Sequence, residues 1–261
     1  MKLRTLASGS SGNCILISAA GGYVLVDCGI SYKRIAAALA SFGVEPGELS
    51  GILITHEHSD HISGLATLTK KLSLPVYASP GTARQLLRRM VWPVGLLRPV
   101  EPGTPFQVGP FEATGFPIPH DAEEPTGFTL TCEGRRAALV TDLGYLTDHV
   151  LDAALGAHLV VCESNHDVEW LRACPYPYHL TARILSDTGH LPNDACAVLA
   201  LRCVEAGART VLLAHLSSEN NTPQHARSAI ETVLRGAGID PDRDITLAVA
   251  PRSEPSPWYE V

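Results

Sequence analysis

The most distinctive group of residues in this sequence is a short run with three histidines and an aspartate, Thr55-His56-Glu57-His58-Ser59-Asp60-His61. Imidazole nitrogens and carboxylate oxygens bind zinc, and also manganese or iron where oxygen ligands are more numerous. So dense a pattern is improbable by chance in a chain with 11 histidines among 261 residues. The alternative is a solvated polar turn. We expect the run to bind divalent metal ions through His56, His58, Asp60 and His61.

A strand before this run and a helix after it would position the four side chains. Residues 51–55 form a short apolar stretch typical of a buried strand, and apolar spacing predicts a helix over 61–72. Because alternate side chains leaving a strand point to one side, His56 and His58 can reach the same ion. The last two residues of the motif begin the helix and can face a second ion.

Turn residues and apolar spacing predict further elements along the chain. Strands are expected over 2–7, 14–18, 23–27, 111–116, 126–132, 136–141, 158–162, 210–214 and 245–249. Helices are expected over 31–42, 80–90, 147–155, 178–187, 193–206 and 222–236, with Ser31 as an N-cap and Ser79-Pro80 opening the second. Residues 91–119 contain seven prolines and should be mostly loop and short strand. This order predicts an α/β (α+β) fold of two sheets packed face to face with helices outside, as one domain over residues 1–261.

The composition excludes several classes of protein. Apolar residues make up 45% of the chain, which excludes intrinsic disorder, and the net charge of -7 excludes a wholly basic protein that coats nucleic acid. No stretch is apolar enough for a membrane span, and no apolar core of a signal peptide follows Met1. The seven cysteines are odd in number and never form Cys-x-x-Cys, so we expect buried thiols in a reducing cytoplasm.

Basic residues are concentrated in the segment that begins at the last residue of the metal motif. Residues 61–100 contain six basic residues and no acidic one, so this segment carries +6 and the remainder of the chain carries -13. Arg84 and Arg88 are four residues apart and share a helix face. Arginine binds phosphate through two parallel hydrogen bonds, so the segment can contact nucleic acid despite the net charge. The alternative is a solvated helix surface.

Later histidines and aspartates complete a larger pattern. Pro119-His120-Asp121, Thr141-Asp142-Leu143 and Ala214-His215-Leu216 each follow an expected strand or strand-like stretch. Together with the His-x-His-x-Asp-His run, they make the sequence resemble the metallo-β-lactamase superfamily. The resemblance implies a four-layer αββα sandwich of two mixed sheets and two divalent ions per chain, zinc or manganese or iron. It assigns to one ion His56, His58, His120 and Asp142, and to the other Asp60, His61, Asp142 and His215, with a water between the ions as the nucleophile.

Two further motifs narrow the resemblance. Cys162-Glu163-Ser164-Asn165-His166-Asp167 and Gly189-His190-Leu191-Pro192-Asn193 are similar to the phosphodiesterase branch typified by ribonuclease Z. In that branch an acid orients a histidine, which gives a proton to the leaving oxygen. The resemblance makes Glu163 and His190 catalytic residues, together with Asp60, because a carboxylate fixes the tautomer of an imidazole and supports its protonated form. The alternative is two ordinary loop residues.

Motifs along nearly the whole chain are similar to one subfamily, YycJ/WalJ. They are Ser8-Gly9-Ser10-Ser11-Gly12-Asn13, the Glu-x-Asn-His-Asp form at 163–167, Gly189-His190-Leu191-x-Asn193 and His215-Leu216-Ser217-x-x-Asn220-Asn221. Pro192 departs from the pattern, where serine is expected, and this puts the local loop geometry in doubt. The subfamily implies an exonuclease that degrades duplex DNA from 5′ to 3′ and is linked to mismatch repair, so DNA is the expected substrate.

Five residues within these motifs are candidates for substrate contact: Ser10, Asn13, His166, Ser217 and Asn221. The Ser/Gly stretch can offer backbone N–H groups to phosphate, or it can be a plain glycine-rich turn. Asn221 can contact substrate or act as a helix cap, and His166 can support the metal site or begin a helix. The alternatives to a DNA exonuclease are a small-molecule hydrolase of a cyclic phosphodiester or thioester, an RNA-processing nuclease, and a non-catalytic scaffold. No oligomeric state is predicted.

Overall fold

The computed structural model describes residues 1–92 and 95–261, and these residues form two compact units. Unit 1 consists of residues 1–117, 122–134 and 251–260. Unit 2 consists of residues 118–121 and 135–250 together with Val261. Each unit carries part of the predicted site, and the expectation of one domain over residues 1–261 stays a prediction.

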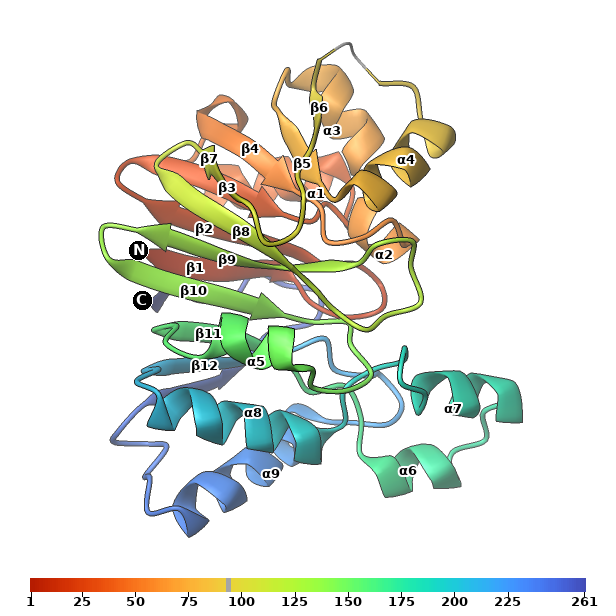
Figure 1. Cartoon of the computed structure of the whole chain (residues 1–261), viewed down its shortest axis with the longest axis vertical. Coiled ribbons are helices and arrows are strands. Elements are labelled where there is room, and N and C mark those ends of the chain that lie inside the picture. Colours follow the sequence, from red (N-terminus) through yellow and green to blue (C-terminus); the bar gives the residue numbers. More distant parts are fainter. Residues whose placement is uncertain (93–94) are drawn as a thin grey trace. The chain divides into compact units, whose positions relative to one another are not determined.

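A mixed sheet of seven strands lies at the centre of unit 1, in the order β14-β1-β2-β3-β4-β5-β6 (Figure 1). The strands are β1 (Lys2–Ala7), β2 (Cys14–Ala19), β3 (Gly22–Val26), β4 (Leu49–Leu53), β5 (Val76–Ala78), β6 (Leu97–Pro99) and β14 (Tyr259–Glu260). From β14 to β3 the strands pair antiparallel, and from β3 to β6 they pair parallel. The carboxyl ends of β3 and β4 therefore lie at one edge of the sheet, and β4 leads into the histidine-rich motif.

The helices of unit 1 follow the parallel strands. They are α1 (Tyr32–Ser41), the 3₁₀ turn η1 (Pro46–Glu48), α2 (Ser59–Ile62), α3 (Leu65–Lys71) and α4 (Pro80–Arg89). The Ser31 side chain accepts a hydrogen bond from the Arg34 backbone, which confirms the predicted N-cap, and Ser79 caps α4 in the same way ahead of Pro80. The apolar faces of α1 and α3 join buried sheet residues in one core, which includes Ile35, Leu68 and Ile52. Unit 1 also contains the antiparallel strands β7 (Pro105–Val108), β8 (Phe111–Pro117) and β9 (Thr126–Cys132).

The predicted helix over 61–72 is wrong in one respect, because the structure divides it into α2 and α3. The Gly64 backbone lies between them and packs against the segment after β3. A Cβ atom on Gly64 would come within 2.0 Å of the Ile30 carbonyl oxygen, and the Gly64 N–H donates to the Cys28 carbonyl. The short helix α2 is therefore separate from α3, and it carries Asp60 and His61.

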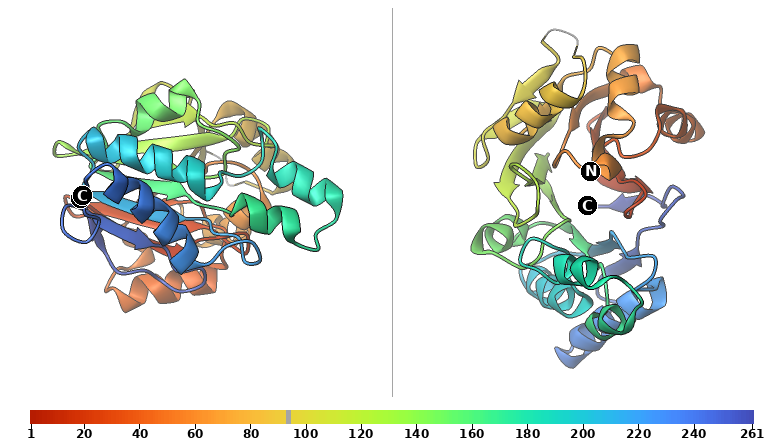
Figure 2. Two further views of the ribbon diagram at one scale, coloured as in Figure 1. Left: turned by 90° about the horizontal axis from the view of Figure 1, so that it is seen from below. Right: turned by 90° about the vertical axis from the view of Figure 1, so that its right-hand side faces the viewer.

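Four parallel strands form the centre of unit 2, in the order β10-β11-β12-β13. They are β10 (Arg135–Val140), β11 (Leu159–Glu163), β12 (Thr210–Ala214) and β13 (Thr246–Val249). The helices are α5 (Asp148–Ala154), α6 (Val168–Ala173), α7 (Tyr178–Ile184), α8 (Asn193–Glu205) and α9 (Pro223–Gly236). Helices α8 and α9 pack side by side and contact β11 and β13, whereas α6 and α7 extend beyond the strands (Figures 1 and 2).

Most predicted elements lie within a few residues of the observed ones, and the unpredicted ones are short. These are η1, β5, α6 and β14, of two to six residues each, too short for a periodic pattern to stand out. The expected loop over 91–119 contains β6, β7 and β8, but its residues 93–94 lie outside the described residues. Among the described residues, no helix has the length and apolar character needed to cross a membrane.

Candidate metal centre and active site

In unit 1, the four residues of the His-x-His-x-Asp-His motif lie together at the end of β4 and in α2. His56 Nε2 lies 3.1 Å from His58 Nδ1, and the ring centres of His56 and His61 are 4.0 Å apart. Asp60 Oδ2 lies 3.5 Å from His61 Nε2. His56 and His61 are buried, with 0% and 1% of their surface exposed. Nitrogen and oxygen atoms of the motif therefore converge within unit 1, as the spacing predicts.

Asp27, at the end of β3, holds one of these histidines and was not among the predicted site residues. Its Oδ2 lies 2.8 Å from His61 Nδ1, and its carboxylate also accepts hydrogen bonds from the Thr55 backbone and hydroxyl. An Nδ1–H that donates to Asp27 leaves Nε2 of His61 as the atom available to a metal. The available sequence signal was the position of Asp27 at the end of a strand that runs parallel to the motif's own strand.

Close backbone packing fixes Asp60. The Asp60 carbonyl accepts from the Asn13 N–H at 2.7 Å, and a Cβ atom on Gly29 would lie only 1.6 Å from that carbonyl oxygen. The Asn13 side chain, a predicted substrate contact, lies 3.2 Å from Asp60 Oδ2 and 3.1 Å from His61 Nε2. Asn13 therefore lies beside the predicted ligands, whereas Ser10 is exposed in the preceding turn.

Some arginines of α4, which belong to the basic segment over residues 61–100, form hydrogen bonds or ion pairs within unit 1. Arg89 donates to the Glu57 carbonyl at 2.5 Å, inside the metal motif. Arg84 lies 3.5 Å from Glu123, an exposed pair of low energetic value. Arg88 is exposed. The α4 surface thus retains basic groups, and one arginine of the segment supports the histidine loop instead.

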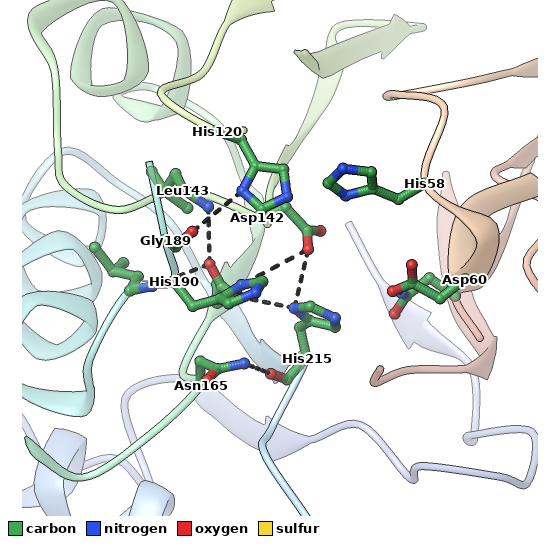
Figure 3. A network of polar contacts seen from close by, with 12 residues as sticks. His58, Asp60, His120, Asp142, Leu143, Asn165, Gly189, His190 and His215 are labelled. Atoms are coloured by element: carbon green, nitrogen blue, oxygen red, sulfur yellow. Dashed lines mark hydrogen bonds and ion pairs between the residues drawn. The ribbon is translucent and has the colours of Figure 1, made fainter. Parts of the chain in front are cut away.

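In unit 2, a second cluster gathers at the carboxyl ends of β10, β11 and β12 (Figure 3). Asp142, Glu163, His190 and His215 bring ligand atoms within 4.8 Å of one another. Glu163 is fully buried, and its Oε1 lies 2.8 Å from both His190 Nδ1 and His215 Nδ1. Asp142 Oδ1 lies 3.1 Å from His215 Nδ1. The four residues come from four separate segments of the chain, and only the fold brings them together.

Glu163 uses its whole carboxylate inside this cluster. Its second oxygen accepts from the backbone N–H groups of Leu143 at 2.9 Å and Leu191 at 3.1 Å. Burial alone raises the pKa of Glu163, but the facing His190 and the hydrogen bonds from His190 and His215 outweigh it and lower the pKa to about 2. The group is therefore a carboxylate that orients two imidazoles through their Nδ1 atoms.

His120 shows the same mode of orientation. Its Nδ1 lies 3.1 Å from the Gly189 carbonyl, which can only accept, so Nε2 is the atom left for a ligand. Burial lowers the pKa of His120, with smaller opposing effects from neighbouring carboxylates, and this favours the neutral imidazole that binds metals. The adjacent Asp121 forms a bidentate pair with Arg183, at 2.5 and 3.1 Å.

Three residues of these clusters have left-handed backbone conformations. Asp27, Asp142 and His215 have φ values of 62°, 62° and 55°, and each directly follows or lies near the end of a strand. Non-glycine residues occupy this region at a cost of about 1–3 kcal/mol, and such strain concentrates at functional sites. In each case the residue with this conformation lies at the carboxyl end of a strand, and its polar side chain belongs to one of the two clusters.

A network of side-chain amides ties the loops of unit 2 together. Asn221 Nδ2 donates to the Ser164 carbonyl at 2.9 Å and to Asn193 Oδ1 at 2.8 Å, and Asn221 Oδ1 accepts from the Thr222 backbone. Asn165 Nδ2 donates to the His215 carbonyl at 2.8 Å. The amide of Asn221 is thus occupied by bonds within the unit, and it positions the loops that carry Glu163, His190 and His215.

The other two predicted substrate contacts lie in the same loops. His166 is buried, and burial is the main effect that lowers its pKa to about 4, so it is a neutral imidazole at pH 7. Its backbone pairs with Pro192, the residue that departs from the subfamily pattern, and the Asn193 N–H donates to its carbonyl. Proline has no N–H, and the bonds that join these two loops come from neighbouring residues. Ser217 Oγ accepts from the backbone of Asn220.

The residues present fit divalent metal ions. His61, His120 and His215 each direct Nδ1 at a carboxylate or carbonyl oxygen, the arrangement that protein metal ligands commonly show. The donor atoms are nitrogen and oxygen, a set that suits zinc, manganese and iron. Burial raises the pKa of the Cys14 and Cys28 thiols, so these neighbours remain protonated and are poor ligands.

Comparisons with known proteins agree with this arrangement. Residues 23–216 match the β-lactamase superfamily domain. Among solved structures, the metallo-β-lactamase fold protein YhfI from Bacillus subtilis superposes with a TM-score of 0.75 at 18% identity, covering 100% of this chain and 99% of that one. The fold is therefore that of the metallo-β-lactamases, an α/β sandwich of two mixed sheets with helices around them, as predicted.

Sequence relatives narrow the assignment. Exodeoxyribonuclease YycJ of Bacillus anthracis is 38% identical over 243 residues, covering 90% of this chain and 89% of the relative. Exodeoxyribonuclease WalJ of Streptococcus pneumoniae serotype 2 is 35% identical over 246 residues, covering 92% and 91%. Within the β-lactamase superfamily, the chain belongs to the YycJ/WalJ family, which confirms the predicted resemblance.

Proposed function

We propose that this protein is a dinuclear metal-dependent phosphodiesterase that degrades DNA as an exonuclease. The observation that carries the proposal is the contact of one buried Glu163 oxygen with both His190 and His215. It places a histidine suited to proton donation beside a histidine suited to metal binding. The names of the two relatives, both exodeoxyribonucleases, support DNA as the substrate.

Seven residues are proposed to bind two divalent ions per chain, zinc or manganese, with iron as a third option. The proposed set follows the family resemblance: His56, His58, His120 and Asp142 for one ion, and Asp60, His61, Asp142 and His215 for the other. The orientation of His61, His120 and His215 within their own units supports this assignment. When bound, such ions would supply an activated water and offset the charge of the phosphate.

The chain's own residues would then manage the proton. The Nδ1–H of His190 donates to Glu163, so Nε2 faces the substrate and carries a transferable proton in the imidazolium form of the ring. As the P–O bond to the leaving group breaks, its electron pair stays on the leaving oxygen, and His190 protonates that oxygen. Glu163 stabilises the imidazolium before transfer and fixes the orientation of the ring. Asp60, which lies beside His61, is proposed to take part in the reaction as a metal ligand.

Finer points of the function are proposals of the same kind. The expected direction is 5′ to 3′ on duplex ends, and the expected location is the cytoplasm. The seven cysteines support a reducing compartment, since all seven are free thiols and six of them are buried. Ser10, Asn13, His166 and Ser217 remain candidates for substrate contact. The amide network favours a positioning role for Asn221.

A polarity-resolved nuclease assay tests the proposal. Purified protein would be given duplex and single-stranded DNA and RNA labelled at either end, with manganese or zinc, and His190→Ala as the control. The proposal predicts loss of nucleotides from the 5′ end of duplex DNA, and at least a 100-fold lower turnover in His190→Ala with an unchanged metal content. Hydrolysis of bis(p-nitrophenyl) phosphate without any cleavage of DNA would instead favour a small-molecule hydrolase.

A further inference from the structure

One segment of unit 2 contributes almost nothing to its core. Helices α6 and α7 and the loop between them extend beyond the four parallel strands (Figures 1 and 2). Every residue from 172 to 188 is exposed or only half-buried, and α7 has no buried residue. Helices in water are normally stabilised by burial of an apolar face. This segment, residues 168–186, is called the aromatic arm below.

Two aromatic rings of the arm are presented to solvent. Tyr178 is 88% exposed at the start of α7, and Trp170 is 42% exposed in α6. The Trp170 ring stacks on His225 with centroids 4.5 Å apart and an interplanar angle of 16°. Asp167 fixes this pair, because its carboxylate accepts from the Trp170 backbone and lies 2.9 Å from His225 Nε2. A ring held in this way can bind a flat partner with little loss of conformational entropy.

The charge of the arm points to an anionic partner. Between residues 168 and 186 the chain contains Arg172, His179 and Arg183 and one acidic residue, Glu169, although the whole chain carries -7. Arg172 is paired with Glu169 at 2.9 Å and remains largely exposed. Exposed aromatic rings among basic groups are the usual surface for single-stranded nucleic acid, whose bases stack on the rings while the phosphates face the cations.

The base of the arm is built into the loops of the candidate active site. The His190 N–H donates to the Ile184 carbonyl at 3.0 Å, and Gly189 packs so tightly that a Cβ atom would lie 2.1 Å from the same oxygen. Arg183 pairs with Asp121, the neighbour of His120. Along α7, Tyr178 lies about 9 Å from Ile184 at 1.5 Å per residue. That length corresponds to roughly three nucleotides of a stacked strand at 3.4 Å each.

We propose that the aromatic arm binds the DNA strand a few nucleotides from the scissile phosphate, with unpaired bases stacked on Tyr178 and Trp170. This inference rests on the proposed function, since it assigns the strand-holding surface of the same site. It predicts that affinity rises with strand length until the strand spans the arm. Because the contact is stacking, the preference for base sequence is weak.

Fluorescence anisotropy with single strands of 2 to 12 nucleotides tests the proposal. The binding protein carries His190→Ala, so that the DNA stays intact. In this His190→Ala background, Tyr178→Ala should raise Kd for the 12-mer by about tenfold and remove most of the increase in affinity with strand length. Tyr178→Phe in the same background should leave Kd unchanged. Trp170→Ala should also raise Kd. Val198→Ala, at an apolar residue of α8 that is 50% exposed, is the control and should leave Kd unchanged.

The outcomes separate the arm from the proposed function. An unchanged Kd in both Tyr178→Ala and Trp170→Ala, with a normal melting temperature, would overturn the arm's role. So would an equal loss in Val198→Ala, or tighter binding of the matching RNA 12-mer than of DNA. Nuclease activity of the unmodified protein is measured in parallel. If binding depends on Tyr178 but the protein does not cleave DNA, the proposed function is overturned and the role of the arm in binding stands. If the protein cleaves DNA but Kd is the same in the two arm variants, the role of the arm is overturned and the proposed function stands.

Discussion

Replacement of Glu163 by glutamine should damage stability, metal binding and turnover together. The buried carboxylate is in contact with four donors, two imidazole Nδ1 atoms and two backbone N–H groups. Glutamine has the same shape, but one of its two terminal atoms is an NH₂ group and would face donors. Two hydrogen bonds to a charged acceptor are lost, each worth about 1.5–3 kcal/mol, so we expect a loss of about 4 kcal/mol. At roughly 2–4 °C per kcal/mol, Tm should fall by about 8–16 °C.

Turnover and metal affinity provide the functional readout for Glu163→Gln. Without its acceptor, His190 loses its orientation, and kcat should fall by at least about 100-fold. His215 loses the same partner, so metal affinity should fall by about 10- to 100-fold. Glu205→Gln, the same change at an exposed position of α8, is the control and should leave all three quantities unchanged. A Glu163→Gln protein with wild-type Tm and wild-type kcat would refute the assignment of Glu163 as the shared acceptor.

Three further predictions concern the packing around the site and one surface pair. Gly29→Ala should cost about 3 kcal/mol or more and lower metal content, because its Cβ atom would overlap the Asp60 carbonyl, whereas Gly47→Ala, which meets no atom within 4 Å, should do neither in melting and metal analysis. Asn221→Ala should cost about 2–4 kcal/mol in denaturant unfolding and lower kcat more than KM, since it removes four or more internal hydrogen bonds; an unchanged kcat would contradict a positioning role. Burial raises the pKa of Asp167, but the hydrogen bonds from His225 and the backbone together lower it by more. The pKa of Asp167 is therefore lower in the folded protein than in the unfolded one. The stabilisation is complete above the unfolded pKa and is lost as pH falls through the folded pKa; Asp167→Asn should therefore lower Tm at pH 7 and have less effect near pH 3.

The sequence predicted the His-x-His-x-Asp-His part of the site well, because these residues lie close together in the chain. The strand before His56 and the polar residues that follow it are contiguous, and the structure brings them together within unit 1. The ends of β10, β11 and β12 were also predicted, so the clustering of Asp142, Glu163 and His215 follows from parallel strands that end at one edge. The Glu163–His190 contact was expected from the family resemblance, and the structure contains it.

The sequence could not predict contacts between residues that are far apart in the chain and belong to no recognisable motif. Asp27 is a single aspartate after an apolar strand, and its role depends on a parallel neighbour that presents His61 to it. Asn193 and Asn221 look like helix caps, and their mutual hydrogen bonds appear only when three loops meet. The break in the expected helix at Gly64 is likewise set by close contact with Ile30, which no local pattern reveals.

Hydrolysis of a 5′-labelled DNA duplex, measured as the protein is loaded stepwise with manganese or zinc, tests the central claim most directly. Bound metal is counted by mass spectrometry in the same samples. A dinuclear phosphodiesterase should be inactive after chelation and should reach full turnover only as the content approaches two ions per chain. Turnover in the fully chelated protein, or no release of nucleotides from protein that holds two ions, would contradict the account.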